Sequence, residues 1–179
     1  MEIQKDKPIS NMLYRLMALA LALSYLFMNA RRQLVKSGVR EGQTILDFGC
    51  GPGFYAIPAA EIVGVKGKVY ALDIHPLAVQ SVKRKAEKKG LANITTILSP
   101  RDTGLPDKSI DVSVIYDAIH MIKDRELLIR ELHRVTKPKG ILSITAEHIK
   151  AEDVIKIAEM DGMFSLKERQ RNLLNFERK

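Results

Sequence analysis

Three glycines and an aspartate near residue 50 have the types and spacing of a ligand-binding loop. Asp47 lies at the end of a short apolar run, and Gly49, Gly51 and Gly53 follow it directly before a helical pattern. Glycines in such a place allow the backbone to come close to a ligand at the carboxyl end of a strand. The loop therefore predicts a binding site for a small molecule.

The spacing of the glycines limits which ligand this is. A dinucleotide fingerprint, G-x-G-x-x-G, would need its third glycine at position 54, but Phe54 stands there and Gly53 comes one position early. The carboxylate of Asp47 would repel a diphosphate and suits a ligand that carries an ammonium group. We interpret the loop as selective for a zwitterionic nucleoside without phosphates. A nucleotide-dependent oxidoreductase is kept as an alternative.

Patterns typical of strands and of helices alternate around this loop. Apolar runs predict strands at 44–48, 68–72, 94–98, 111–116 and 141–145. Helical patterns lie at 53–63, 77–89 and 127–135. This alternation predicts a doubly wound α/β domain, a mostly parallel sheet with helices on both faces. A helix at 152–161 and closing strands at 163–169 and 173–177 bring the predicted sheet to seven strands. We assign residues 38–179 to this domain and residues 1–37 to an N-terminal helical extension.

An apolar stretch at residues 12–28 dominates the extension. It is seventeen residues long, contains Arg15, and is flanked by Lys5, Lys7, Arg31 and Arg32. That length is at the lower edge of a bilayer span, and a charge inside it makes a span less favourable. We expect a helix packed over the domain's pocket or a helix resting on a membrane surface. A homodimer interface is a further use of the same surface, and a secretory signal is the less favoured alternative.

Composition limits the function classes only coarsely. The formal net charge of +8 suits anionic partners of several kinds, and it is spread along the chain. The single cysteine, Cys50, excludes an intramolecular disulfide and any multi-cysteine zinc site, and it is consistent with a cytoplasmic protein. The four histidines have no metal-ligand spacing, so we predict no metal site.

The stretch Asp47-Phe48-Gly49-Cys50-Gly51-Pro52-Gly53 resembles the first motif of class I S-adenosylmethionine-dependent methyltransferases. Residues 105–112 and 135–140 are similar to the family's approaches to its fourth and fifth strands. The resemblance covers about residues 40–179. It implies a Rossmann-like fold, methyltransferase activity, and S-adenosyl-L-methionine as the cofactor.

The resemblance also implies which residues form the cofactor site. In the family an acidic residue at the end of the second strand binds the ribose hydroxyls; Asp73 matches it, and Ile74 would line the adenine. Asp102 is the nearest match to the acidic residue near the adenine amino group, although the sequence around it, residues 99–103, departs from the family's pattern. Helix capping by Asp47 or Asp73 and a plain turn role for Asp102 are the alternatives. The implied cofactor-binding residues are Asp47, Gly49, Cys50, Gly51, Gly53, Asp73, Ile74, Asp102 and Tyr116.

The family places the transferred methyl beside residues 116–120. Methyl transfer from a sulfonium mainly needs the two reactants to be held within reach, so a base is optional. Tyr116 could orient donor or acceptor, and His120 could take a proton from a hydroxyl or an amine. A packing role is the alternative for His120.

For the acceptor, the sequence favours a small or lipid-like molecule. Residues 116–119 do not resemble the Asn/Asp-Pro-Pro-Tyr/Phe motif of enzymes that methylate the exocyclic amines of bases, so a nucleic acid is disfavoured. One cysteine does not suit the arsenic-methylating relatives either. A noncatalytic S-adenosylmethionine-binding module is the remaining alternative. An apolar lid over the methyl-transfer site could come from Leu13, Leu16, Leu19, Ala20, Leu23 and Phe27.

Overall fold

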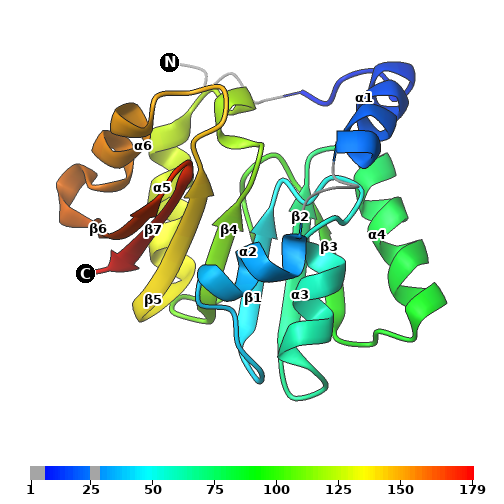
Figure 1. Cartoon of the computed structure of the whole chain (residues 1–179), viewed down its shortest axis with the longest axis horizontal. Coiled ribbons are helices and arrows are strands. Elements are labelled where there is room, and N and C mark those ends of the chain that lie inside the picture. The colour runs from blue at the N-terminus through cyan, green and yellow to red at the C-terminus, as the bar shows by residue number, and fades with distance from the viewer. Residues whose placement is uncertain (1–6, 25–28) are drawn as a thin grey trace.

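The computed structural model describes residues 7–24 and 29–179 and contains one seven-stranded sheet (Figure 1). The strand order is β3-β2-β1-β4-β5-β7-β6. The strands are β1 (Thr44–Phe48), β2 (Lys68–Asp73), β3 (Ile94–Leu98), β4 (Ile110–Ile115), β5 (Thr136–Thr145), β6 (Phe164–Gln170) and β7 (Leu173–Arg178). All seven lie at or within a few residues of the predicted strands.

The first five strands are parallel, and β7 is antiparallel to both β5 and β6. The chain runs from β1 outward to β3 and then returns to place β4 on the other side of β1. The direction of winding therefore reverses between β1 and β4. In open α/β sheets, ligands bind beyond the carboxyl ends of the strands at such a reversal. The predicted doubly wound, mostly parallel fold is confirmed.

Helices cover both faces of the sheet (Figure 1). Leu34 of α2 (Ala30–Lys36), the apolar face of α3 (Ala56–Val63) and Val82 of α4 (Pro76–Lys89) belong to one buried cluster with the centres of β1, β2 and β4. The second cluster joins the sheet to α5 (Arg125–Val135) and α6 (Ala151–Ala158). Two short 3-10 helices, η2 (Ile119–Met121) and η3 (Met160–Gly162), complete the described elements after β1.

Two boundaries differ from the predicted ones for local reasons. Helix α3 begins at Ala56 rather than at residue 53, because Gly53 has a φ of 93° and ends the loop before the helix. Pro58 then falls in the first helical turn, where its missing N–H is not needed. Strand β5 begins at Thr136, five residues early, with an irregularity opposite Ile110 and Val112. The predicted turn at 138–140 lies within that irregular stretch.

The described part of the extension contains two helices. α1 (Asn11–Ser24) lies beyond the amino-terminal end of α4, whereas α2 packs against the sheet (Figure 1). Ser10 accepts a hydrogen bond from the amide of Leu13 at the start of α1, and Asn29 caps α2 through Arg32. Among the described residues, no helix is long and apolar enough to cross a membrane. Phe27, part of the predicted lid, lies outside the described residues.

Candidate functional site

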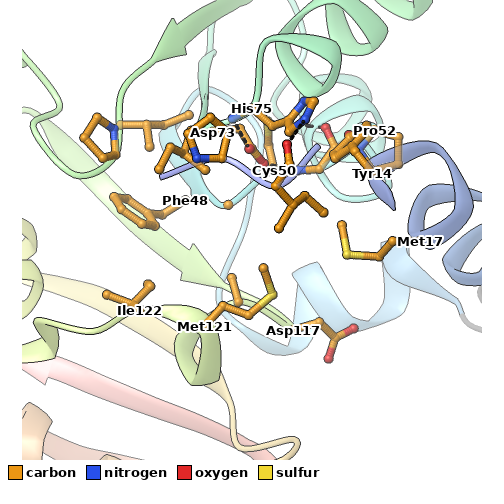
Figure 2. Close-up of a pocket in the computed structure, with 18 of the residues that line it drawn as sticks. Tyr14, Met17, Phe48, Cys50, Pro52, Asp73, His75, Asp117, Met121 and Ile122 are labelled. Carbon is orange, nitrogen blue, oxygen red and sulfur yellow. Dashed lines mark hydrogen bonds between the residues drawn. The ribbon is translucent and has the colours of Figure 1, made fainter. Parts of the chain in front are cut away.

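A cavity of about 590 Å³ opens at the carboxyl ends of β1, β2 and β4, at the reversal of the winding. The glycine loop after β1 forms one wall, and residues 116–118 after β4 form another. Helix α1 and the segment 7–9 close the cavity from the side opposite the sheet. Figure 2 shows side chains from α1, the sheet and η2 converging on this space. The cavity lies where the sequence predicted a small-molecule site.

The three glycines of the loop have different roles. All have positive φ values, 75° at Gly49, 50° at Gly51 and 93° at Gly53, which side chains disfavour. A Cβ at Gly49 would lie 2.7 Å from the Cβ of Ala118, and one at Gly53 would lie 3.1 Å from Val82, so both allow close packing. A Cβ at Gly51 would meet nothing within 4 Å. Gly51 therefore faces the open space in which a ligand would lie.

Asp73, at the end of β2, is held against this loop. Its Oδ2 accepts a hydrogen bond from the amide of Gly51 at 2.8 Å, and its Oδ1 accepts one from the amide of His75 at 2.8 Å. The carboxyl lines the cavity and is 8% exposed. Burial raises its pKa, and the two backbone N–H groups oppose that rise. Each oxygen keeps a lone pair that could accept a further hydrogen bond from a ligand.

Asp47, the penultimate residue of β1, lies next to the glycine loop and is not among the residues that line the cavity. Its side chain is 2% exposed, and within the described part of the chain its Oδ2 has no hydrogen-bond partner. Burial, aided by the negative charge of Asp73, raises the pKa of Asp47 to about 7, although the amide of Ala56 donates to it. A buried carboxyl without a full set of partners is costly unless a ligand completes it. This orphaned oxygen indicates a cationic or hydrogen-donating ligand group beside the loop.

The remaining predicted cofactor residues divide between the cavity and the surface. Cys50 and Ile74 line the cavity, and burial raises the pKa of the Cys50 thiol, so this cysteine is not a reactive thiolate. Asp102 is exposed, and its Oδ1 accepts a hydrogen bond from the amide of Gly104 in a turn. The cavity wall after β3 is made by Ser99 and Pro100 instead. The structure thus places Asp102 in the alternative role of a turn residue.

Tyr116 lies at the cavity with its hydroxyl turned into the core. The hydroxyl is 2.6 Å from Ser37 Oγ and donates to Ser143 Oγ at 3.1 Å. Ser143 in turn donates to Asn175 at 2.7 Å, so the network ties β4 to α2, β5 and β7. Burial raises the pKa of Tyr116 well above its ordinary value. The ring can support a ligand, but the hydroxyl is occupied in positioning the ring.

His120 does not line the cavity. It lies on η2, edge-on to His148 with ring centroids 5.0 Å apart, and its Nδ1 has no hydrogen-bond partner among the described residues. Burial, followed by the neighbouring His148, lowers its pKa, which favours a neutral ring. The packing alternative for His120 therefore fits the structure better than the predicted catalytic one.

A pair of carboxyl groups lies beside the cavity where the sequence predicted a histidine. Asp117 directly follows Tyr116, lines the cavity, and has a φ of 52°, an unusual conformation for a residue with a side chain. Its amide donates to Thr145 Oγ1 at 2.9 Å, which holds the turn against β5. Hydrogen bonding to Asp117, followed by burial, raises the pKa of Glu147 to about 7. Glu147 is therefore close to its protonation midpoint near neutral pH, beside the carboxyl that lines the cavity.

Helix α1 does cover the cavity, but with a different face from the predicted one. Tyr14, Met17 and Leu21 line the cavity. Four of the predicted lid residues, Leu13, Leu16, Leu19 and Leu23, are 52% to 61% exposed on the other side of the helix. The prediction of the lid face was wrong because α1 is apolar on both sides, so its sequence period does not distinguish them.

Tyr14 and His75 connect α1 to the wall of the cavity that follows β2 (Figure 2). The two rings are stacked, with centroids 4.1 Å apart and an interplanar angle of 14°. His75 Nε2 lies 3.1 Å from the carbonyl oxygen of Ile9, and its Nδ1 accepts a hydrogen bond from the amide of Leu77. These contacts fix the ring with its proton on Nε2. Sequence reasoning missed both residues, because nothing in the local pattern ties position 14 to position 75.

Comparisons with known proteins agree with this geometry. A family described as "Methyltransferase domain" matches residues 40–175. A demethylmenaquinone methyltransferase of Geobacillus stearothermophilus is 35% identical over 107 residues, 59% of this chain and 46% of that protein. A protein-L-isoaspartate O-methyltransferase of Pyrococcus horikoshii is 32% identical over 131 residues, 72% of this chain and 56% of that protein. The chain thus spans about half the length of these curated relatives.

Among solved structures, a SAM-dependent methyltransferase from Aquifex aeolicus superimposes with a TM-score of 0.72 and 27% identity. The match covers 84% of this chain and 88% of that one. The family match spans most of the sequence, and the glycine loop, the acidic strand ends and the sheet order all fit S-adenosylmethionine as the cofactor. The chain belongs to the methyltransferase-domain family.

Proposed function

We propose that this chain transfers a methyl group from S-adenosylmethionine to a small, largely apolar acceptor. The observation that carries the proposal is the orphaned, buried carboxyl of Asp47, which directly precedes the cavity-lining residues 48–52, together with Asp73, which lines the cavity itself. A ligand with an ammonium group and two vicinal hydroxyls would complete both carboxyls. S-adenosylmethionine has both features and no phosphate.

Each wall of the cavity has a distinct part in this proposal. Asp47 would pair with the methionyl ammonium group, and Asp73 would accept hydrogen bonds from the ribose hydroxyls while the amides of Gly51 and His75 hold its oxygens in place. Ile74 and Pro100 would contact the adenine, a role for which Asp102 is too exposed. Gly49 and Cys50 hold the loop, since both amides donate to the carbonyl of Leu72, at 2.8 and 2.9 Å.

The bound cofactor supplies a methyl group on a positively charged sulfur, with a neutral thioether as the leaving group. What this chain must add is position and the exclusion of water. Tyr116, fixed through its hydroxyl, and Phe48 give rigid walls, and Met17 and Met121 close the cavity from α1 and η2 (Figure 2). An apolar acceptor would displace water from these surfaces and lie against the methyl.

Where the acceptor loses a proton, we assign its removal to Asp117. This carboxyl lines the cavity, which His120 does not. Its hydrogen-bond partner Glu147 has a pKa of about 7, so near neutral pH Glu147 can take up a proton that Asp117 passes on. Asp117 is thus the proposed base, and Glu147 is a positioning residue that hydrogen-bonds to it.

The acceptor class is inferred from the cavity and from one relative. Demethylmenaquinone, named for the Geobacillus relative, is an apolar ring with a lipid tail, and the lining here is of the same chemical kind. The Pyrococcus relative is named for a protein acceptor, so membership of the family alone does not choose. A small aromatic or lipid-like acceptor agrees best with the apolar lid.

We further propose that residues 38–179 form the methyltransferase domain, that residues 1–37 supply its lid, and that the protein acts in the cytoplasm.

The test is calorimetric titration with S-adenosylmethionine, S-adenosylhomocysteine and NAD. We expect both adenosyl ligands to bind and NAD not to bind. Asp73→Ala should weaken the adenosyl ligands by about 10- to 100-fold, because it removes charge-assisted hydrogen bonds. Asp102→Ala is the matched control, an aspartate outside the cavity, and should bind normally. No binding, or a preference for NAD, would overturn the proposal.

Cofactor binding alone would also suit a noncatalytic module. Turnover therefore needs its own measurement, with a panel of naphthoquinols, phenols and fatty acids as acceptors and S-adenosylhomocysteine formation as the readout. Formation of methylated product with at least one of them supports an enzyme. Binding without turnover on any of the panel would favour the noncatalytic alternative.

A further inference from the structure

The outer face of α1 is an apolar stripe that no other described element covers. Leu16, Leu19 and Leu23 are 60%, 61% and 59% exposed, and Met12 at the start of the stripe is 74% exposed. The spacing of 12, 16, 19 and 23 places these side chains on one side of the helix. Contiguous exposed apolar surface of this kind is rare on monomeric proteins unless it binds something.

The opposite side of α1 is engaged with the cavity. Tyr14 is 5% exposed and stacks on His75, and Met17 and Leu21 line the cavity. These inner contacts fix the rotation of α1 about its axis. The outer stripe therefore stays on the side of the helix that faces away from the cavity. The helix presents apolar side chains both to the ligand and to the outside.

The charges around α1 indicate what covers the stripe. From residue 7 to residue 32 the sequence contains no aspartate or glutamate, and its basic residues are Lys7, Arg15, Arg31 and Arg32. In the described structure all four are exposed. A basic segment with an exposed apolar stripe is typical of helices that lie in the interface of an anionic bilayer.

A second copy of the chain fits these charges less well. A two-fold dimer would place the same patch against itself, so the basic residues of one copy would face those of the other without a carboxylate in the segment to compensate. The described part of the helix, 14 residues or about 21 Å, is also too short to span a bilayer. A position parallel to the membrane plane agrees with both observations.

We infer that α1 docks on the surface of an anionic phospholipid bilayer through Met12, Leu16, Leu19 and Leu23, with Arg15 and the flanking basic residues contacting headgroups. The inference rests on the proposed function only for its consequence: the lid of the cavity would lie at the membrane surface. Met121, 52% exposed and lining the cavity, would give an apolar acceptor a path from the bilayer past the lid.

The test is co-sedimentation of the full chain with vesicles of phosphatidylglycerol and phosphatidylcholine, and with vesicles of phosphatidylcholine alone. We expect binding to the anionic vesicles that falls with added salt, and at least about tenfold weaker binding to the neutral ones. The double variant Leu16→Ser/Leu19→Ser should lose about tenfold or more in vesicle affinity. Val65→Ser is the matched control, since Val65 is 98% exposed in the α3–β2 turn; it should bind like the wild type.

Three results would overturn the inference: no binding to anionic vesicles, equal binding by the double variant, or a dimer in sedimentation velocity that the double variant abolishes. The last would assign the stripe to a second copy. S-adenosylmethionine titration of the same variants separates this inference from the proposed function. Normal cofactor binding without vesicle binding defeats only the membrane inference, whereas vesicle binding without cofactor binding defeats only the methyltransferase proposal.

Discussion

The two sides of the cavity are built in opposite ways. The sheet side, from Asp47 to Asp73, consists of buried strand ends and backbone amides that hydrogen-bond within the loop. The lid side, from Tyr14 to Leu21, is a single helix whose contacts with the domain are side-chain packing and one ring stack. Backbone geometry fixes the first side, and the second depends on a few replaceable contacts. We therefore expect ligand recognition to depend on the rigid side and ligand access to depend on the lid.

The largest effect should come from breaking the rigid side at Gly49. In Gly49→Ala the new Cβ would lie 2.7 Å from the Cβ of Ala118 at a φ of 75°. Overpacking and backbone strain together should cost about 3 kcal/mol of unfolding free energy and weaken S-adenosylmethionine by about 100-fold or more. Thermal unfolding and calorimetry measure the two effects.

Gly51→Ala is the control for this variant. Its Cβ would have nothing within 4 Å, so the loss of stability should be limited to the strain of a φ of 50°. It should still weaken ligand binding, because the methyl would fill the space above the loop. Equal loss of stability in both variants would contradict the distinct roles given to the two glycines.

The next largest effect should come from replacing Asp117, the proposed base at the acceptor end of the cavity. If Asp117 is the base, Asp117→Asn should lower kcat by about 100-fold with little change in cofactor affinity, for an acceptor that loses a proton. Glu147→Gln should change the pH profile of kcat near pH 7, because it removes the Glu147 carboxyl whose pKa is about 7. His120→Ala should leave kcat unchanged. A large loss in His120→Ala together with normal turnover in Asp117→Asn would restore the histidine as the base.

The third prediction concerns pH and the buried carboxyl of Asp47. Its pKa of about 7 means that the folded chain holds this proton more tightly than the unfolded chain does. The contribution of Asp47 to stability is therefore present below its ordinary pKa and lost as the pH rises through about 7. A ligand ammonium favours the carboxylate, so affinity for S-adenosylmethionine should rise by up to about tenfold per pH unit and level off above about pH 7.

Two controls make this pH dependence specific. 5′-Methylthioadenosine lacks the ammonium group and should bind with little pH dependence. Asp47→Asn should bind S-adenosylmethionine weakly at every pH and, without the ligand, should raise the Tm near pH 8 because no buried charge forms there. Retention of the full pH dependence in Asp47→Asn would assign it to another group.

The smallest effect should come from the lid. Tyr14→Ala removes the stack on His75 and should weaken S-adenosylmethionine by about tenfold, with only a small change in Tm. Leu16→Ser, on the outer side of the same helix, should change neither quantity in the absence of membranes. Calorimetry on this pair distinguishes the two faces. Equal losses in both variants would mean that α1 as a whole, rather than its inner face, supports the site.

Much of the fold and one side of the site followed from the sequence alone. Short apolar runs and glycine turns have local physical causes, so the seven strands and the order α3 to α6 could be predicted with errors of a few residues at most boundaries. The glycine loop and Asp73 could be predicted for the same reason: each lies directly at the end of a strand, and parallel strand ends meet at one edge of the sheet. Sequence determined the cofactor class and predicted residues that line the sheet side of the cavity.

Only the tertiary structure decided which distant side chains complete the cavity. The stack of Tyr14 on His75, the Asp117–Glu147 pair and the network of Tyr116 with Ser37 and Ser143 join segments that are far apart in the chain. A helix with apolar residues on two opposite sides carries no period that reveals its inner face, and a turn does not show which carboxyl will lie beside which strand. These choices are made by packing across the sheet, and packing is non-local.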